Sequence, residues 1–231
     1  MARLIPADVQ AVVFDAVGTI LFPDPPVSRI YREIAQQFGS SPPDADHFRR
    51  HFRRCFIEEE ERDRAHDWQT SEQWEIDRWR RIVIGCLSDV TDAEAAFQAL
   101  FAHFALPEAW TLPDDFGPVC DGLAARGLRL GLGSNYDSRL HSVIAGHPHL
   151  QRLDPVIISS QVGYRKPSGR FFASLVHALG MPPRSILFVG DDVQNDFEGA
   201  RAAGLQVILL DGEGRHPEIT PRIRRLADLL E

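Results

Sequence analysis

Four segments of the sequence carry side chains that could do chemistry together. Each lies directly after, or shortly beyond, an apolar run of the kind that forms a buried strand. Carboxylates crowded together require a cation, and hard oxygen ligands suit Mg²⁺. A lysine beside them would neutralise an anionic substrate and keep the carboxylates ionised. The residues concerned are Asp15, Ser134, Asn135, Lys166, Asp191 and Asp196.

Lys166 is the only lysine among the 25 basic residues of the chain. Arginine presents a wide planar fork, whereas lysine carries a compact charge. This difference gives a chemical reason for an amine at that one position. Asp15, at the end of a strand, could then act as a nucleophile and form a covalent intermediate through its carboxylate.

The apolar pattern predicts the elements that would hold these residues. From about residue 113 onward, strand and helix patterns alternate, which indicates a parallel sheet with right-handed crossovers and helices on both faces. In such sheets ligands bind at the carboxyl ends of the strands. The predicted strands cover residues 10–16, 128–133, 154–159, 186–189 and 207–210. The predicted helices are one that stops at Gly127 and others over 137–146, 168–179 and 195–203.

A second stretch, about residues 27–104, has helical periodicity throughout and separates the first strand from the rest of the sheet. We therefore predict an α/β protein with a Rossmann-like parallel sheet core, residues 1–21 and 112–231, and an inserted all-helical cap domain, residues 22–111. Ser71, with acidic and amide residues just after it, is typical of a helix start. The predicted helices of this stretch cover 27–39, 44–66, 71–87 and 92–104.

Composition excludes several classes of protein. A chain of 231 residues that is 44% hydrophobic and 25% charged is typical of globular proteins and not of disordered ones. The net charge of -8 argues against nucleic-acid binding, which needs clustered lysine and arginine. No apolar run approaches a membrane span, and the N-terminus lacks the pattern of a secretory signal, so we expect a cytoplasmic protein. The sequence gives no indication of oligomeric state.

Cysteine usage agrees with that location. Cys55, Cys86 and Cys120 are odd in number, widely spaced and free of any paired motif. Neither a disulfide framework nor a zinc site is indicated. We expect buried free thiols.

The arrangement resembles the haloacid dehalogenase superfamily, most of whose members are phosphatases, and the resemblance covers nearly the whole chain. Four short motifs match in order and in spacing at successive strand ends, and the helical insertion is similar to a type 1 cap of subfamily I. The motifs are residues 14–19 (FDAVGT), 133–135 (GSN), 165–168 (RKPS) and 190–196 (GDDVQND).

The resemblance implies a role for each matching position. Asp15 would be the nucleophile, and Lys166 would bridge it to the phosphate. Ser134 and the amide of Asn135 would bind phosphate. Asp191 would ligate Mg²⁺, and Asp196 would ligate it or orient a ligand. The full ligand set would be Asp15, the backbone carbonyl of Val17, Asp191 and Asp196, around a Mg²⁺ cofactor.

Val17 is a departure from the pattern of the superfamily's phosphatases. They carry a second Asp at this position, which protonates the leaving alcohol and then activates water, and valine cannot transfer a proton. Loss of a general acid–base costs ~10²–10⁴ in rate, or about 3–5 kcal/mol of barrier. Substrates with good leaving groups, such as aryl or acyl phosphates, should suffer least.

The expected function is that of a Mg²⁺-dependent hydrolase of the phosphatase type, acting on a small phosphorylated molecule through Asp15. One alternative is a 2-haloacid dehalogenase, which uses the same nucleophile without metal; the retained acidic loop at 191–196 weighs against it. A second alternative is a phosphoryl-binding or regulatory protein that has lost turnover together with the second Asp. We expect no nucleic-acid partner and no membrane partner.

Overall fold

A six-stranded parallel sheet forms the centre of the computed structural model, which describes residues 4–40, 45–87 and 89–231. The strand order is β5-β4-β1-β6-β7-β8, with β1 in the middle. The predicted α/β fold with a parallel sheet is therefore confirmed. The strands are β1 (Ala11–Phe14), β4 (Arg129–Ser134), β5 (Val156–Ile158), β6 (Ile186–Gly190), β7 (Gln206–Leu210) and β8 (Arg222–Ile223).

The register of the central strands brings three chain segments to one edge of the sheet. Phe14, the last residue of β1, pairs with Leu132 of β4 and Val189 of β6. Beyond the strand, the backbone N–H of Asp15 still donates to the carbonyl of Val189 at 2.9 Å. The residues that follow β1, β4 and β6 therefore emerge side by side, as the sequence predicts.

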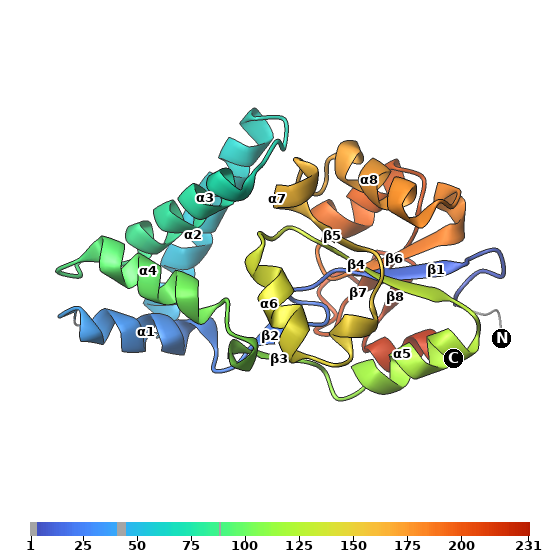
Figure 1. The fold of residues 1–231 in the computed structure, drawn as a ribbon, viewed down its shortest axis with the longest axis horizontal. Coiled ribbons are helices and arrows are strands. Elements are labelled where there is room, and N and C mark those ends of the chain that lie inside the picture. Colours follow the sequence, from blue (N-terminus) through green and yellow to red (C-terminus); the bar gives the residue numbers. More distant parts are fainter. Residues whose placement is uncertain (1–3, 41–44, 88) are drawn as a thin grey trace.

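Helices cover both faces of this sheet (Figure 1). Successive residues of β1 point to opposite faces, so Val12 and Phe14 pack with α5 and α6 while Ala11 and Val13 pack with α8 and α9. The helices are α5 (Phe116–Ala125), α6 (Arg139–Gly146), α7 (Ser159–Val162), α8 (Gly169–Leu179) and α9 (Gly199–Ala202). Short 3₁₀ turns lie at Pro107–Ala109, Leu150–Arg152, Pro183–Ser185 and Leu226–Leu230.

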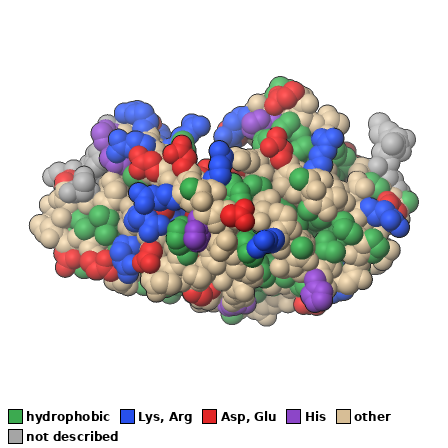
Figure 2. Space-filling model, turned by 90° about the horizontal axis from the view of Figure 1, so that it is seen from above, with side chains coloured by type: hydrophobic (Ala, Val, Ile, Leu, Met, Phe, Trp, Pro, Cys, Tyr) green, Lys and Arg blue, Asp and Glu red, His purple; other side chains and the backbone are tan. Residues whose placement is uncertain are grey.

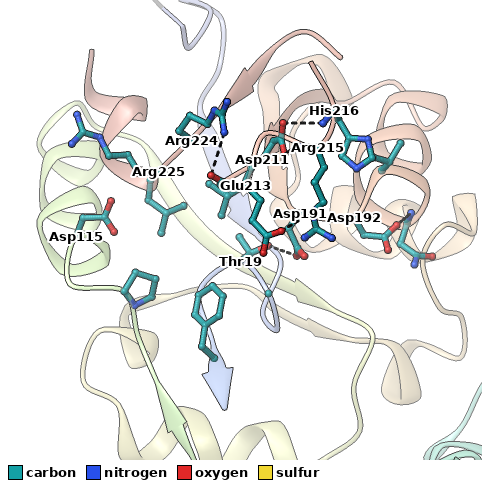
Figure 3. Close-up of a pocket in the computed structure, with 18 of the residues that line it drawn as sticks. Thr19, Asp115, Asp191, Asp192, Asp211, Glu213, Arg215, His216, Arg224 and Arg225 are labelled. Carbon is teal, nitrogen blue, oxygen red and sulfur yellow. Dashed lines mark hydrogen bonds and ion pairs between the residues drawn. The ribbon is translucent and has the colours of Figure 1, made fainter. Parts of the chain in front are cut away.

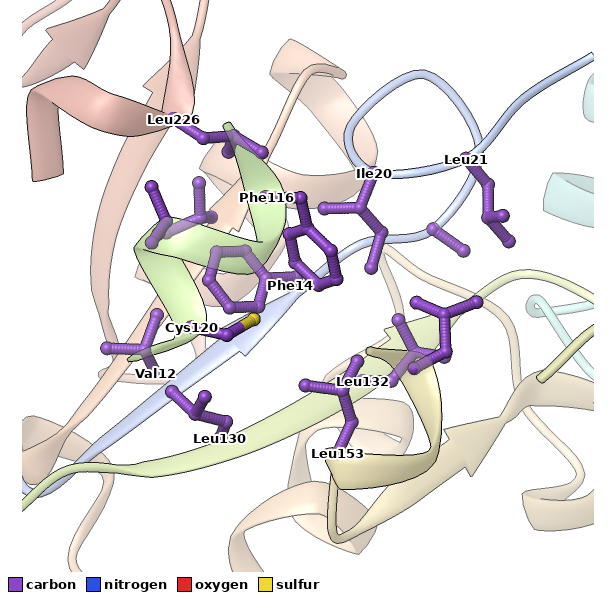
Figure 4. Close-up of a cluster of buried hydrophobic side chains, with 14 of the residues drawn as sticks. Val12, Phe14, Ile20, Leu21, Phe116, Cys120, Leu130, Leu132, Leu153 and Leu226 are labelled. Carbon is purple, nitrogen blue, oxygen red and sulfur yellow. The ribbon is translucent and has the colours of Figure 1, made fainter. Parts of the chain in front are cut away.

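The larger of the two apolar layers lies between β1, β4, α5 and the C-terminal 3₁₀ turn (Figure 4). Phe14 meets Phe116 of α5 edge to face, with ring centroids 5.6 Å apart. Such pairs contribute about 0.5–1.5 kcal/mol beyond the burial of their area. This packing on the α5 face of the sheet fixes β1 and so positions Asp15, which follows the end of that strand.

Four further helices form the helical insert, residues 27–103, which lies to one side of the sheet (Figure 1). The insert leaves and rejoins the rest of the chain through β2 (Phe22–Pro23) and β3 (Trp110–Thr111), which pair antiparallel. Its helices agree with the predicted ones, although the predicted start at residue 44 lies outside the described residues. They are α1 (Val27–Gln37), α2 (Ala45–Ala65), α3 (Glu72–Cys86) and α4 (Ala93–His103).

The insert has an apolar core of its own, in which α2 packs on α3 and α3 on α4. Phe48, Phe52 and Phe56 recur at four-residue spacing along α2 and stack on one another. The Ser71 side chain accepts from the backbone N–H of Trp74, which confirms the predicted helix start. All three cysteines are free and buried, as expected.

One predicted helix is different in the structure. The sequence pattern predicts an α-helix over 195–203, whereas a π-helical turn runs over Val193–Glu198 and only Gly199–Ala202 is α-helical. The side chain of Asp192 accepts from the backbone N–H of Asn195 at 2.7 Å and starts the wide turn early. The spacing of apolar residues does not predict this turn, because a π-helical turn inserts one extra residue that need not be apolar.

The surface shows no gathering of one charge sign on the face seen in Figure 2, where Arg side chains alternate with Asp and Glu. This agrees with the expected absence of a nucleic-acid partner but does not test it. None of the described helices is long and apolar enough to cross a membrane. The cytoplasmic location stays a prediction.

Candidate active site

The amine of Lys166 lies between two carboxylates that come from distant parts of the chain. Its Nζ is 2.5 Å from Oδ1 of Asp15 and 2.6 Å from Oδ1 of Asp196. It also donates to the carbonyl of Gly133 at 3.1 Å. All three side chains are buried, so each charge interaction acts in a poorly solvated environment. The sole lysine of the chain therefore joins the ends of β1, β4 and β6.

Asn135 holds the loop that carries Lys166. Its side-chain amide donates to the carbonyl of Lys166 at 3.0 Å, and its side-chain carbonyl accepts from the Lys166 backbone N–H at 2.7 Å. This reciprocal pair orients the carboxamide toward the Lys166 backbone. Asn135 thus lies beside the predicted site, and its backbone N–H is the group that the family resemblance assigns to phosphate.

Asp191 completes an acidic group with Asp15 and Asp196. One carboxylate oxygen of each lies within 4.8 Å of the others. Oδ1 of Asp191 accepts from the hydroxyl of Thr19 at 2.9 Å. Asp196 is held from the other side by the backbone N–H of Asp192 at 3.1 Å. One ammonium faces three carboxylates here, which leaves negative charge for a cation to neutralise.

The pKa values reflect this crowding. Burial raises the pKa of Asp15, although Lys166 acts in the opposite direction. Desolvation by the surrounding protein, together with the charge of Asp196, raises the pKa of Asp191 to about 6. Burial and the charge of Asp15 raise the pKa of Asp196 to about 7. Burial lowers the pKa of Lys166, but Asp15 and Asp196 more than offset this, so it stays protonated.

A cavity of about 320 Å³ opens above these groups, between the sheet edge and the helical insert. Asp15, Ser134, Lys166 and Asp191 line its floor. Val17 lines it too, and its side chain is 41% exposed. The side chain at the position of the missing second Asp therefore faces free space and offers no proton.

The insert supplies most of the opposite wall, and that wall is strongly aromatic. Seven aromatic side chains line the cavity: Tyr31, Phe52, Phe56, Trp79, Phe104, Trp110 and Tyr136. Three arginines line it as well: Arg78, Arg139 and Arg165. Arg139 lies flat on Phe101, with its guanidinium 3.6 Å from the ring centroid, and pairs with Asp137 at 2.7 Å.

Ion pairs join the insert to the sheet domain at this cavity. Arg165, next to Lys166, pairs with Glu75 and with Asp63 at 3.3 Å, both from the insert. Glu72 at the start of α3 accepts from the Ser138 backbone N–H at 3.1 Å and from the Ser160 hydroxyl at 2.5 Å. The wall of the cavity is therefore held against the floor by charge-assisted bonds.

A second, more open pocket of about 860 Å³ lies on the other side of Asp191 (Figure 3). Asp191 and Thr19 line it together with Arg215, His216 and Arg224. Asp191 thus borders both spaces. Glu60 of the insert also borders both spaces.

Sequence reasoning missed several groups around the cavity. Thr19 is not among the predicted site residues, but its hydroxyl donates to Oδ1 of Asp191. Arg165 belongs to the motif that identifies Lys166, and its position there is a usable signal. Arg78 and the aromatic wall carry no such signal, because arginine and helical aromatics recur throughout residues 27–104.

Residues 9–204 match the family profile of haloacid dehalogenase-like hydrolases. The chain belongs to this family. The human haloacid dehalogenase-like hydrolase domain-containing protein 3 is 32% identical over 148 residues, which cover 62% of this chain and 57% of that protein. The chain therefore matches little more than half the length of such relatives. The phosphoserine phosphatase of Thermus thermophilus is 39% identical over 111 residues, 46% of this chain and 43% of that enzyme.

Solved structures agree on the fold. A phosphatase of this family from Thermococcus onnurineus superposes with a TM-score of 0.66 at 23% identity, covering 96% of both chains. The L-2-haloacid dehalogenase of Xanthobacter autotrophicus superposes with a TM-score of 0.71 at 17% identity, covering 96% of this chain and 97% of that one. At these identities the similarity establishes the fold of the family and does not choose between its reactions.

Proposed function

We propose that this hydrolase is a Mg²⁺-dependent phosphatase that acts on a small phosphate ester through Asp15. The observation that carries the proposal is the Lys166 amine held between Asp15 and Asp196, with Asp191 completing three converging carboxylates. Dehalogenation needs the nucleophile but no such group of three acids. The phosphatase names of the Thermus relative and of a Mycobacterium tuberculosis relative, 36% identical over 104 residues, support the same reading.

The donor set fits Mg²⁺, because every group that could reach the ion is a hard oxygen. Asp15, Asp191 and Asp196 would hold it, with the Val17 carbonyl in the role that the family resemblance assigns. When bound, the ion would neutralise charge on the phosphoryl oxygens. Ser134, the Asn135 backbone N–H and Lys166 would bind those oxygens, and the helical insert would act as the cap that excludes water.

In the proposed reaction a carboxylate oxygen of Asp15 attacks phosphorus. The bond from phosphorus to the leaving oxygen breaks, and the electron pair stays on that oxygen. Water then attacks the aspartyl phosphate, releasing phosphate and restoring the Asp15 carboxylate. Val17 donates no proton to the leaving oxygen, so the first step should be fastest for aryl and acyl phosphates.

The test is a screen of aryl phosphates, alkyl phosphates and 2-haloacids, each with Mg²⁺ and with chelator. We expect Mg²⁺-dependent phosphate release, highest for aryl phosphates, and none from Asp15→Asn. Acid-stable phosphate on Asp15 should be trapped during turnover. Halide release in the presence of chelator would establish the dehalogenase instead.

The screen also separates a second candidate, which the exposed Val17 side chain favours: a phosphoryl-binding protein without turnover. Such a protein would bind phosphate esters with Mg²⁺ by calorimetry and release no phosphate from any of them. Multiple turnover on an aryl phosphate would exclude it.

A further inference from the structure

Arg78 of α3 is a buried guanidinium on the wall of the catalytic cavity. Its side chain is 1% exposed and lines the cavity with Phe56 and Trp79. Its Nε donates to Oδ2 of Asp63 at 2.9 Å. Among the described residues, Nη2 of Arg78 has no hydrogen-bond partner. A buried donor left unsatisfied is costly, so this one needs an acceptor that the described part of the chain does not provide.

The charges around Arg78 are already balanced. Arg78 and Arg165 share two carboxylates, those of Asp63 and Glu75. Trp74 adds a neutral donor to Asp63 at 2.8 Å. A further carboxylate brought into this buried group would be an uncompensated charge, which is expensive to desolvate. The missing acceptor is therefore best supplied by an uncharged oxygen.

The surroundings of the guanidinium are apolar. The centre of the Arg78 guanidinium lies 4.6 Å from the ring centroid of Phe56 and 5.8 Å from that of Trp79. Tyr31, Phe52 and Trp110 continue the same wall. A volume of about 320 Å³ is at the small end for ligand pockets, which limits a leaving group to about one ring. Ring faces and edges of this kind pack best against another flat apolar group.

We propose that Arg78 is a specificity-determining residue, whose Nη2 donates a hydrogen bond to an uncharged acceptor oxygen on the leaving group of the substrate. The substrate class is then a phosphate monoester of a compact aromatic or other flat apolar alcohol bearing one carbonyl, ether or hydroxyl oxygen. This inference rests on the proposed phosphatase function and adds the chemistry of the leaving group to it.

The test uses arylmethylphosphonates, which carry a phosphate-like group that cannot be hydrolysed. Calorimetry with Mg²⁺ compares benzylphosphonate with its ring-acetylated and ring-carboxylated derivatives, each as the ortho, meta and para isomer. A hydrogen bond from a charged donor is worth about 1.5–3 kcal/mol, so the best acetyl isomer should bind about 10–150-fold tighter than the parent compound. The carboxylated isomers should bind no better than the parent.

Arg78→Met should weaken binding of the acetyl isomer more than binding of benzylphosphonate, so that the preference for the acetyl isomer is lost. Arg80→Met is the matched control, since Arg80 lies on the same helix, pairs with Asp77 and Glu94 and does not line the cavity. If Arg78→Met does not fold, Arg78→Lys keeps the charge but lacks the planar fork, and it should lose the preference too.

Equal binding of parent and acetyl compounds by the unaltered protein, or a preference that survives in the Arg78 variants, overturns the inference and leaves the proposed phosphatase standing. Tighter binding of a carboxylated isomer overturns the assignment of an uncharged acceptor. Binding of no phosphonate at all, with Mg²⁺ present, removes the phosphatase proposal itself.

Discussion

At the scale of single residues, Val17 is the position that most constrains the chemistry. Its side chain is 41% exposed on the cavity that also holds Asp15 and Lys166. An exposed apolar side chain at a reacting centre contributes little to stability and nothing to proton transfer. Under the proposed function, the site would have Asp15 as its nucleophile but no resident acid at this position.

Val17→Asp should therefore raise the rate on alkyl phosphates, whose leaving oxygen needs a proton. The expected gain in kcat/KM approaches ~10²–10⁴, with a much smaller gain for aryl phosphates. Val17→Asn is the matched control, because it has the same shape and cannot act as an acid. Equal rates for the two variants would show that a carboxyl group at this position does not restore acid catalysis.

The raised pKa values of Asp191, about 6, and Asp196, about 7, make the affinity for Mg²⁺ depend on pH. Protons must leave these carboxyls before the ion binds, so affinity should rise between pH 5.5 and 7.5, by about tenfold per pH unit for each displaced proton. The stability of the metal-free protein should depend on pH in the opposite direction. A carboxyl with a raised pKa binds more protons in the folded state than in the unfolded state, so metal-free stability should fall as pH rises.

Thermal unfolding with Mg²⁺ and with chelator, across this pH range, checks both effects. Asp191→Asn should raise the metal-free melting temperature at pH 7.5 and remove most of the stabilisation by Mg²⁺. Asp121→Asn is the control, since that carboxylate lies in an exposed pair with Arg152, away from the cavity. A Mg²⁺ effect that is independent of pH would contradict the assignment of these carboxyls as ligands.

At the scale of elements, the loops after β1 and β6 are packed so closely that side-chain volume decides the site. Gly18 has a φ of +96°, and a Cβ there would lie 2.5 Å from Oδ2 of Asp191. A Cβ on Gly190 would collide with the side chain of Asp196. Gly18 therefore leaves room for the side chain of Asp191, and Gly190 leaves room for that of Asp196.

Gly18→Ala should cost about 1 kcal/mol of stability from its backbone conformation. It should also lower Mg²⁺ affinity about 10–100-fold by displacing Asp191. Gly127→Ala separates the two effects, because Gly127 has a φ of +78° and nothing within 4 Å of its Cβ position. The control should lose similar stability and keep its Mg²⁺ affinity; a similar loss of affinity in both would mean that backbone strain alone is responsible.

At the scale of the whole molecule, polar contacts join the insert to the sheet domain. Hydrogen bonds from Ser160 and from Ser138 lower the pKa of Glu72, although partial burial acts against them. A carboxyl with a lowered pKa gives its stabilisation above its ordinary titration range and loses it as pH falls through the lowered value. The contact is therefore intact at neutral pH.

Glu72→Gln should loosen this contact at neutral pH, because an amide oxygen accepts more weakly than a carboxylate. We expect faster hydrogen exchange at the start of α3 and around residue 138, and a roughly two- to tenfold lower kcat/KM from less complete closure. Glu58→Gln is the control, since Glu58 is exposed and pairs with Arg54 of the same helix. Unchanged exchange in Glu72→Gln would show that Glu72 does not hold the insert in place.

The sequence by itself determined five of the six strands of the sheet, the four-helix segment and the meeting of Asp15, Ser134, Lys166, Asp191 and Asp196. The reason is physical: short apolar runs closed by turn residues specify parallel strands, and the carboxyl ends of neighbouring parallel strands must share an edge. The sequence did not predict β8 or the paired strands β2 and β3. The roles of these residues in catalysis stay predictions, as do the domain boundaries.

Only the tertiary structure decided what stands opposite those residues. The carboxamide of Asn135 is used in holding Lys166, the turn at Val193–Glu198 is π-helical, and Arg78 and Arg165 share Asp63. Helical periodicity tells which residues share a face, but not which neighbour that face meets or at what angle. The shape and polarity of the cavity depend on those angles, so both are set by packing that no local pattern encodes.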